Sequence, residues 1–280
     1  MSFEMLSEAP KGTIIKVVGV GGAGGNAIEH MIRNHVQGVE FISANTDAQA
    51  LSQSTAQHTL QLGESGLGAG AKPEVGRAAA EENRERIADM LRGANMVFIT
   101  AGMGGGTGTG AAPVIAEISK QLGILTVGVV SKPFEHEGKR RMMVAEEGLR
   151  QLEQHVDSLI VVLNEKLEET LGEDALQDEM HEAADEVLNN AVAGISEIIN
   201  VQDNINVDFN DVKTVMGEQG RAMMGSGTAS GPERARIAAE EAIASPLLDG
   251  GNLAGARGIL SNISASRDTL KGRETREATN

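Results

Sequence analysis

Two glycine-rich segments, each between an apolar strand and an apolar helix, constrain the fold of this chain more than any other feature. GVGGAGGN, at residues 19–26, follows an expected strand at 14–18 and leads into a helix through Ile32. GMGGGTGTG, at residues 102–110, follows an expected strand at 96–100 and precedes a helix expected at 111–122. A glycine turn at the positively polarised N-terminus of a helix lets backbone N–H groups approach a phosphate. Two such turns favour an anion larger than one diphosphate, such as a triphosphate.

The first segment alone leaves alternatives open. It matches the G-x-G-x-x-G pattern, which suits a dinucleotide as well as a nucleotide, or only a tight strand-to-helix turn. With Asp47 some distance beyond it, the pattern would also be compatible with a dinucleotide-dependent oxidoreductase. The second segment favours a triphosphate. The chain contains no G-x-x-x-x-G-K-[ST] sequence, so a P-loop lysine is not expected.

Strands and helices alternate along the first part of the chain. Further strands are expected at 39–44, 125–130 and 159–163, and a helix at 73–91. This alternation predicts an α/β fold with a mainly parallel sheet flanked by helices on both faces. Apolar residues at helical spacing over 180–199 predict one long central helix, whose apolar stripe faces the core and not a ligand. Beyond it, helices are expected around 212–216 and 232–244, and a strand at 258–263.

Length and charge narrow the class of protein. A chain of 280 residues is long enough for one large domain and a smaller or incomplete second one. Its formal net charge of -16 argues against binding to nucleic acid and against direct binding to anionic membranes. The absence of cysteine excludes disulfides, thiolate metal sites and a cysteine nucleophile. The first ten residues do not resemble a signal peptide, and no apolar run approaches the roughly 18 residues of a membrane helix, so a cytoplasmic protein is expected.

Several segments together resemble the tubulin/FtsZ superfamily of GTPases, and particularly its bacterial cell-division branch. They are GGGTGTG within AGMGGGTGTGAAPV, SANTDAQAL, GLGAGAKPEVGR and NVDFND, in the family's order and spacing over roughly residues 13–280. The resemblance implies a protein that binds GTP and GDP with Mg²⁺ and hydrolyses GTP. It also implies a cytoskeletal protein that assembles head to tail into filaments of the division ring, where division-ring regulators are possible partners.

The resemblance also implies a domain organisation. It predicts an N-terminal leader over 1–12, a GTP-binding Rossmann-like domain over 13–179, a central connecting helix over 180–204 and a C-terminal, GTPase-activating domain over 205–280. Members of the family continue through a full second sheet and a flexible tail that binds membrane anchors. The printed sequence contains neither, so the second, α+β domain is expected to be incomplete.

The family's nucleotide-binding positions carry over residue by residue, and none of them is assigned to a metal. Glu137 and Arg141 match positions near the ribose and phosphates. Asn164 and Asp185 match positions that hydrogen-bond the guanine edge. An Asp there accepts from guanine N1–H and N2–H₂, which adenine lacks, so GTP should be preferred to ATP. The full set is Gly21, Gly22, Ala23, Gly24, Gly25, Asn26, Asp47, Gly70, Ala71, Gly104, Gly105, Gly106, Thr107, Gly108, Thr109, Glu137, Arg141, Asn164, His181 and Asp185.

A second group, Asn206, Asp208 and Asp211, matches the family's loop that completes the active site of a neighbouring subunit. Neither glycine segment supplies a group that could orient the attacking water, whereas a carboxylate pair from another molecule could do so and could help hold the metal. Residue spacing alone favours a plainer role, in which Asp208 caps a helix beginning near Asn210 and Asp211 favours its positive end. The alternative function is a non-polymerising GTP-binding module that caps or modulates filaments of a complete homologue.

Three positions depart from the family pattern. His181 stands where the family usually has a phenylalanine stacked on guanine, and His136 replaces another phenylalanine. Lys72 replaces an asparagine often seen in this loop. A stacked base contributes about 1–3 kcal/mol, and an imidazole should retain only part of that. Neither histidine is interpreted as a metal ligand or a catalyst.

Overall fold

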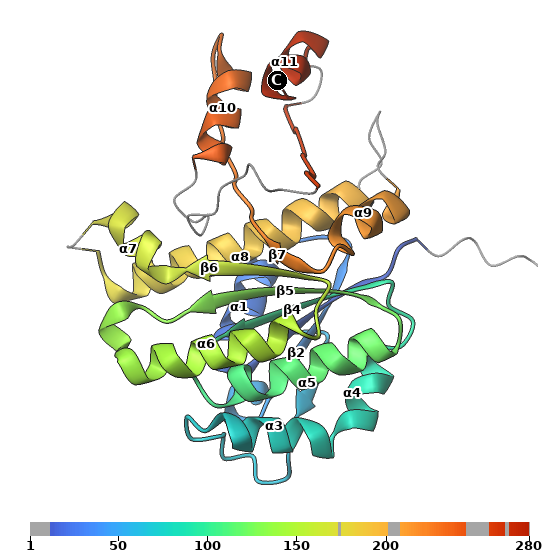
Figure 1. The fold of residues 1–280 in the computed structure, drawn as a ribbon, viewed down its shortest axis with the longest axis vertical. Coiled ribbons are helices and arrows are strands. Elements are labelled where there is room, and N and C mark those ends of the chain that lie inside the picture. Colours follow the sequence, from blue (N-terminus) through green and yellow to red (C-terminus); the bar gives the residue numbers. More distant parts are fainter. Residues whose placement is uncertain (1–11, 173–174, 201–207, 245–257, 267–268, 280) are drawn as a thin grey trace, which may run out of the picture.

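The computed structural model describes residues 12–172, 175–200, 208–244, 258–266 and 269–279 (Figure 1). The predicted leader, apart from Gly12, lies outside the described residues. So do Asn206 and the start of the predicted second domain. Among the described helices, none combines the length and the apolar character needed to cross a bilayer.

A single sheet of seven strands, in the order β3-β2-β1-β4-β5-β6-β7, lies at the centre of the fold (Figure 1). Every neighbouring pair is parallel. All strands therefore end at the same edge, which is where ligands bind in open parallel sheets. The strands are β1 (Ile15–Val20), β2 (Val39–Asn45), β3 (His58–Gln61), β4 (Met96–Gly102), β5 (Leu125–Lys132), β6 (Ser158–Leu163) and β7 (Gly220–Ala222).

Helices cover both faces of the sheet, and each face has its own apolar core. One core joins the strands to α3, α4, α5 and α6, and the other joins them to α1, α8 and α9. Val17 and Val18 of β1 belong to different cores because successive side chains of a strand point to opposite faces. The helices are α1 (Gly21–Arg33), α2 (Ala48–Ser52), α3 (Pro73–Glu82), α4 (Arg84–Leu91), α5 (Thr107–Gln121), the 3-10 turn η1 (Glu135–Glu137), α6 (Lys139–Glu153), α7 (Asn164–Leu171), α8 (Gln177–Asn200), α9 (Phe209–Met216), α10 (Arg234–Ile243) and α11 (Gly272–Thr279).

The structure confirms the α/β class, the parallel sheet and the long central helix, and corrects two helix boundaries. The helix expected over 73–91 is interrupted at Asn83, whose side-chain amide donates to the carbonyl oxygen of Ala79 at 2.9 Å. Asparagine competes in this way with the helical backbone pattern. The helix expected from Ala111 begins earlier, at Thr107, so its first turn is made of the glycine-rich segment itself.

The expected strand over 258–263 is not formed, although these residues are described. A strand needs a neighbour to satisfy its backbone groups, and no described strand pairs with this segment. The short strand β7 was not expected, and it extends the first sheet beside β6. Both β7 and α9 thus pack with the first sheet, although they lie within the segment predicted as a second domain. That division of the chain stays a prediction.

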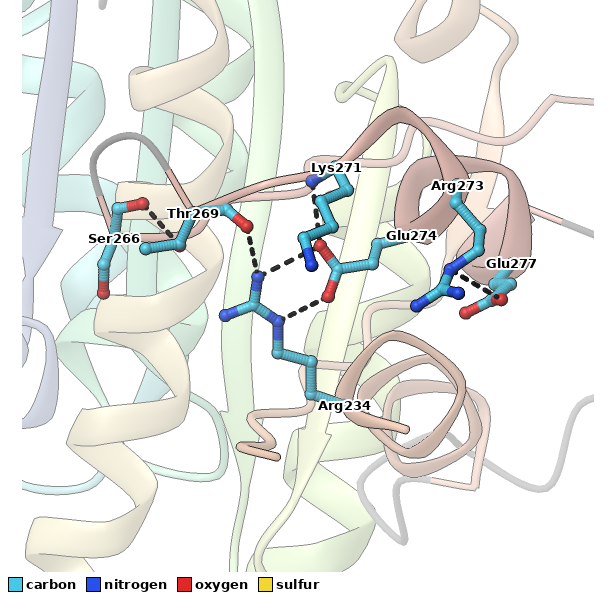
Figure 2. A network of polar contacts seen from close by, with 7 residues as sticks. All are labelled: Arg234, Ser266, Thr269, Lys271, Arg273, Glu274 and Glu277. Atoms are coloured by element: carbon cyan, nitrogen blue, oxygen red, sulfur yellow. Dashed lines mark hydrogen bonds and ion pairs between the residues drawn. The ribbon is translucent and has the colours of Figure 1, made fainter. Parts of the chain in front are cut away.

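Helices α10 and α11 form a pair that stands beyond α8, away from the sheet (Figure 1). Arg234 Nε donates to Glu274 Oε1 at 2.8 Å, and its Nη2 donates to Glu274 Oε2 at 3.0 Å (Figure 2). The same Nη2 donates to the carbonyl oxygen of Thr269, and Glu274 Oε2 also accepts from the backbone N–H of Lys271. The hydrogen bond from Arg234 is the largest cause that lowers the pKa of Glu274 to about 2. A charged contact therefore joins α10 to α11.

Candidate nucleotide-binding site

The two glycine segments meet at the carboxyl edge of the sheet, because β1 and β4 are neighbours and each leads directly into its helix. Gly21 has a left-handed φ of 75°, and a Cβ atom built on it would lie 2.9 Å from the backbone nitrogen of Gly108. A Cβ atom on Gly24 would lie 2.4 Å from the carbonyl oxygen of Thr100. Only glycine fits at these two positions, so the sequence brings the starts of α1 and α5 together.

Both helices begin without a side-chain cap. The residues before their first turns, Val20 and Gly106, make no side-chain capping hydrogen bond. The first N–H groups of a helix have no partner within the helix, and the helix dipole adds positive potential there. A Cβ atom built on Gly22 or on Gly105 would meet nothing within 4 Å, so the space before both turns is open. Two uncapped helix starts facing the same space suit a ligand with several phosphate groups.

A third loop lies against the second glycine segment. A Cβ atom on Gly106 would lie 2.8 Å from the backbone nitrogen of Lys72 and 2.8 Å from the Cβ of Ala69. Gly70 and Ala71 follow in the left-handed region with φ values of 57° and 55°, and both are exposed. An alanine there is strained, and such strain persists only where the surrounding structure imposes it. The predicted residues Gly70 and Ala71 therefore lie beside the second glycine segment.

Asp47 and Thr46 follow β2 at the same edge. The Asp47 carboxylate caps α2 by accepting from the backbone N–H groups of Gln49 and Ala50 at 2.9 and 3.2 Å. This structural role occupies the carboxylate oxygen that faces α2. Thr46 was not predicted as a site residue, yet its hydroxyl lies 2.6 Å from the hydroxyl of Thr107. The end of a strand at this edge was the signal that could have identified it.

Glu137 and Arg141 form an ion pair with a distance of 2.8 Å between Oε2 and Nη1. Glu137 Oε1 also accepts from the backbone N–H of Phe134 at 2.9 Å. A Cβ atom on Gly104 would lie 2.8 Å from the Cγ of Arg141, which places this pair directly beside the second glycine segment. The structure therefore brings both residues beside the second glycine segment, and their role near the phosphates stays a prediction.

Asn164 begins α7 immediately after β6 and is buried. Its Oδ1 has no hydrogen-bond partner. Among the described residues, only three buried side-chain nitrogen or oxygen atoms lack a partner, and this is one of them. An unpaired buried acceptor costs about 1–3 kcal/mol. A ligand that donates a hydrogen bond to this atom would remove that cost.

Asp185 and His181 lie one turn apart on α8. Burial raises the pKa of the Asp185 carboxyl from 3.8 to about 6, against the opposing effects of His30 and then Arg33. His181 is exposed, and its ring meets Phe134 edge-on, with ring centroids 5.3 Å apart. His136 is the second ring neighbour of Phe134 and stacks face-to-face on it, also with centroids 5.3 Å apart. The two histidines that depart from the family pattern therefore share one buried phenylalanine, Phe134.

Asp208 and Asp211 lie at the opposite edge of the sheet. The end of α8 contacts the amino end of β2 through Asn200 Nδ2, which donates to the Gly38 carbonyl oxygen at 2.8 Å. The end of α9 contacts the amino end of β6, where the Ser158 hydroxyl donates to the Met216 carbonyl oxygen at 2.7 Å. Helix α8 thus crosses the sheet from the carboxyl edge to the amino edge (Figure 1).

The capping role that residue spacing allowed for Asp208 is present. Its carboxylate accepts from the backbone N–H groups of Asn210 at 2.7 Å and Asp211 at 3.0 Å, and both aspartates are exposed. Within one chain, the structure does not bring these carboxylates to the glycine segments. The described residues also contain no group of three or more His, Asp or Glu that could hold a metal ion.

Sequence models of known families match most of the chain. The model described as Tubulin/FtsZ family, GTPase domain, matches residues 14–172. The model described as FtsZ family, C-terminal domain, matches residues 220–280.

Individual relatives extend this likeness to nearly the full length of the chain. The cell division protein FtsZ of Azotobacter vinelandii is 61% identical over 273 residues, which cover 96% of this chain and 69% of that protein. A solved FtsZ dimer from M. jannaschii is 48% identical with a TM-score of 0.82, and the match covers 85% of this chain and 70% of that one. CetZ2 from Haloferax volcanii, solved as a GTPγS-bound protofilament, has a TM-score of 0.69 at 23% identity over 80% of this chain and 69% of that one, a likeness in fold alone.

Proposed function

Because the chain belongs to the tubulin/FtsZ family, we propose that it binds GTP where the starts of α1 and α5 meet, with the phosphates against the two glycine segments. The chain is a GTPase of the cell-division type, and a cytoskeletal protein. The observation that carries the proposed location is the pair of uncapped helix starts that face one open space. Backbone N–H groups at a helix start bind phosphate without any charged side chain.

The guanine base is proposed to lie between α7 and α8. Asn164 Oδ1, buried and without a partner, is available to accept from the base. Asp185, when ionised, would accept from N1–H and N2–H₂, which selects guanine over adenine. His181 would lie against one face of the base, and its edge contact with Phe134 would orient the imidazole.

Calorimetry with GTP, GDP and ATP tests this site. Asp185→Asn should weaken GTP binding about 10- to 100-fold, because a hydrogen bond to a charged group contributes about 1.5–3 kcal/mol. ATP binding should stay weak and unchanged. The control is Asp178→Asn, an exposed aspartate in the first turn of the same helix, which should bind GTP like the unaltered chain. Equal affinity of the unaltered chain for ATP and GTP would contradict the assignment.

Mg²⁺ is proposed to bind mainly through phosphate oxygens and water. Such a site needs no cluster of protein carboxylates, which suits the described residues. When bound, the ion would supply positive charge that offsets the negative charge developing on the phosphates during hydrolysis.

Hydrolysis is proposed to occur where two copies meet head to tail. The phosphate site lies at the carboxyl edge of the sheet, whereas Asp208 and Asp211 are exposed at the amino edge. Head-to-tail stacking would place the carboxylates of one copy beside the GTP of the next, where they could orient the attacking water. The M. jannaschii relative solved as a dimer supports self-association.

A complementation assay tests the shared site. Asp211→Ala keeps the nucleotide edge but lacks one carboxylate, and Asp185→Asn keeps the carboxylates but binds GTP weakly. Each variant alone should release phosphate slowly, and their mixture should exceed the sum of the two. A mixture no faster than that sum would contradict a shared site.

Sedimentation in GTP separates filament formation from the alternative of a module that only caps filaments.

The site of action in the cell is proposed to be the division ring. The net charge of -16 disfavours direct contact with anionic membranes, so attachment there would depend on partner proteins such as division-ring regulators. A fluorescent fusion imaged in dividing cells tests this location. Uniform fluorescence throughout the cell cycle would contradict it.

A further inference from the structure

A buried histidine joins the two helices that carry opposite ends of the proposed GTP site. His30 lies on α1, one helical turn after Asn26, and only 7% of it is exposed. Its Nε2 lies 2.7 Å from Glu186 Oε2 on α8. The side-chain amide of Asn34, one turn further along α1, donates to the same oxygen at 3.2 Å. One carboxylate oxygen of α8 therefore accepts from two side chains of α1.

The contact between His30 and Glu186 lies where it can fix the distance between the proposed phosphate-binding turn and the proposed guanine-binding carboxylate. Helix α1 begins at the first glycine segment, and α8 carries Asp185 directly before Glu186. A shift of α8 along α1 would move the guanine-binding carboxylate relative to the phosphate-binding turn. The second polar contact of α8, from Asn200 to Gly38, is at the far end of the helix, so it restrains Asp185 less directly.

The same histidine supplies charge beside Asp185. The groups that act on this carboxylate are His30 and Arg33 from α1 and Glu182 from its own helix, with Glu186 paired to His30. His30 gives the largest effect that favours the ionised carboxylate, Arg33 adds to it, and Glu182 opposes it. This support requires the positively charged form of His30.

We infer that His30 is a positioning residue for guanine recognition, which binds α8 to α1 through Glu186 and keeps positive charge beside the half-buried Asp185 carboxylate. The inference rests on the proposed GTP site. Protonated His30 donates its Nε2 proton to Glu186, and its charge favours the ionised form of Asp185 that accepts from guanine. A histidine that only packs two helices together would hold the fold but would not affect which base is bound.

The test compares GTP with inosine triphosphate, which lacks the 2-amino group of guanine. His30→Gln retains a donor for Glu186 but removes the charge, and His30→Ala removes both. The matched control is His58→Gln, the same change at an exposed position of β3. The ratio of the two affinities is measured by calorimetry from pH 5.5 to pH 8.

The unaltered chain should lose its preference for GTP as the pH falls through about 6, where Asp185 takes up a proton. His30→Gln should lose it about one pH unit higher, so that near pH 6.5 its preference is about threefold smaller. His30→Ala should show the same shift and also a lower melting temperature, while His58→Gln should match the unaltered chain. Arg33→Gln, at an exposed position, should shift the profile in the same direction by less, which gives a second measurement if His30 variants fold poorly.

Two outcomes distinguish a failure of the inference about His30 from a failure of the proposed GTP site. A folded His30→Gln variant with the profile of the unaltered chain would overturn the role of His30 and leave the GTP site intact. An unaltered chain that binds the two nucleotides equally at every pH would overturn Asp185 as the guanine-binding residue. In that case the proposed base site itself fails.

Discussion

The sheet with its flanking helices and the α10–α11 pair are stabilised in different ways. Two apolar cores cover the faces of the sheet, and side chains such as Phe98 and Met31 are wholly buried there. No residue of α10 is buried, and the one buried residue of α11 is the charged Glu274. The free energy of local opening depends on buried apolar contact. The proposed GTP site therefore rests on the more stable region, whereas α10 and α11 are joined by a contact that depends on charge.

The largest expected effect is a loss of stability in the sheet region. Gly24→Ala would place a Cβ atom 2.4 Å from the Thr100 carbonyl oxygen, which forces α1 away from β4. Overpacking of this kind should lower the free energy of unfolding by about 3 kcal/mol. Urea unfolding measures it, with Gly22→Ala as the matched control because its added Cβ meets nothing within 4 Å. Equal midpoints for the two variants would show that α1 is not held against the sheet as described.

A second substitution in the sheet region, Asp185→Asn, is expected to raise the free energy of unfolding instead of lowering it. The pKa of Asp185 is raised in the folded protein from 3.8 to about 6, so the folded state resists ionisation. This cost is absent below pH 3.8, grows as the pH rises towards 6 and is complete above it. Asp185→Asn without nucleotide should therefore raise the free energy of unfolding at pH 8 by about 1–2 kcal/mol, allowing for partial exposure.

Thermal unfolding at pH 8 and pH 4 checks the sign, and the gain should disappear at pH 4. With saturating GTP at pH 8 the order should reverse, because only the unaltered chain gains stability from tight binding. Asp178→Asn, exposed on the same helix, should change neither value. A gain of the same size at both pH values would mean that burial of the charge is not its cause.

A smaller loss of stability is expected when the helix cap at the amino edge of the sheet is removed. Asp208→Ala removes the cap of α9 and should cost about 1 kcal/mol, whereas Asp208→Asn retains an equally good capping group. If Asp208 also orients water, Asp208→Asn should lose GTP turnover while keeping its stability. Urea unfolding and phosphate release, measured on both variants, separate the two roles. Normal turnover in Asp208→Asn would leave capping as its role.

The smallest change in global stability is expected from the α10–α11 pair. Glu274→Gln removes the charge that Arg234 binds, so amide hydrogens of α10 and α11 should exchange faster while the unfolding midpoint of the sheet stays unchanged. Because the folded pKa of Glu274 is lowered from 4.5 to about 2, the contribution is present above pH 4.5 and is lost only as the pH falls through about 2. Glu277→Gln, which alters an exposed pair with Arg273, is the control. A lower unfolding midpoint for Glu274→Gln would show that the two regions unfold together.

The elements predicted best were those whose pattern is local. Runs such as 96–100 and 125–130 became central strands because continuous apolar sequence suits a strand buried on both faces. The similar run at 258–263 did not, because its pattern cannot show whether a partner strand exists. Strand β7, with the sequence GRA, carries no apolar alternation and is recognisable only from its place beside β6.

In the candidate site, too, the features predicted from sequence were the local ones. The glycine segments were found from sequence because a strand, a glycine turn and a helix are consecutive along the chain. The Glu137 and Arg141 pair, the Thr46 contact with Thr107 and the capping by Asp47 became visible only in the structure. The ion pair and the Asp47 cap are short-range contacts whose partners depend on rotamers. The contact between Thr46 and Thr107 joins the end of β2 to the start of α5, which are far apart in the sequence.

The sequence by itself determined the parallel α/β class, the two glycine turns between strand and helix and, through the family resemblance, the choice of GTP. These follow from residues close together in the chain, where glycine, apolar periodicity and helix starts act locally. The tertiary structure alone decided that Asp208 and Asp211 lie at the edge of the sheet opposite the two glycine segments. It also decided that Asn164 has an unpaired buried acceptor and that His30 contacts Glu186 across 156 residues. Such relations depend on how the sheet and α8 bring distant segments together, and no local pattern contains that information.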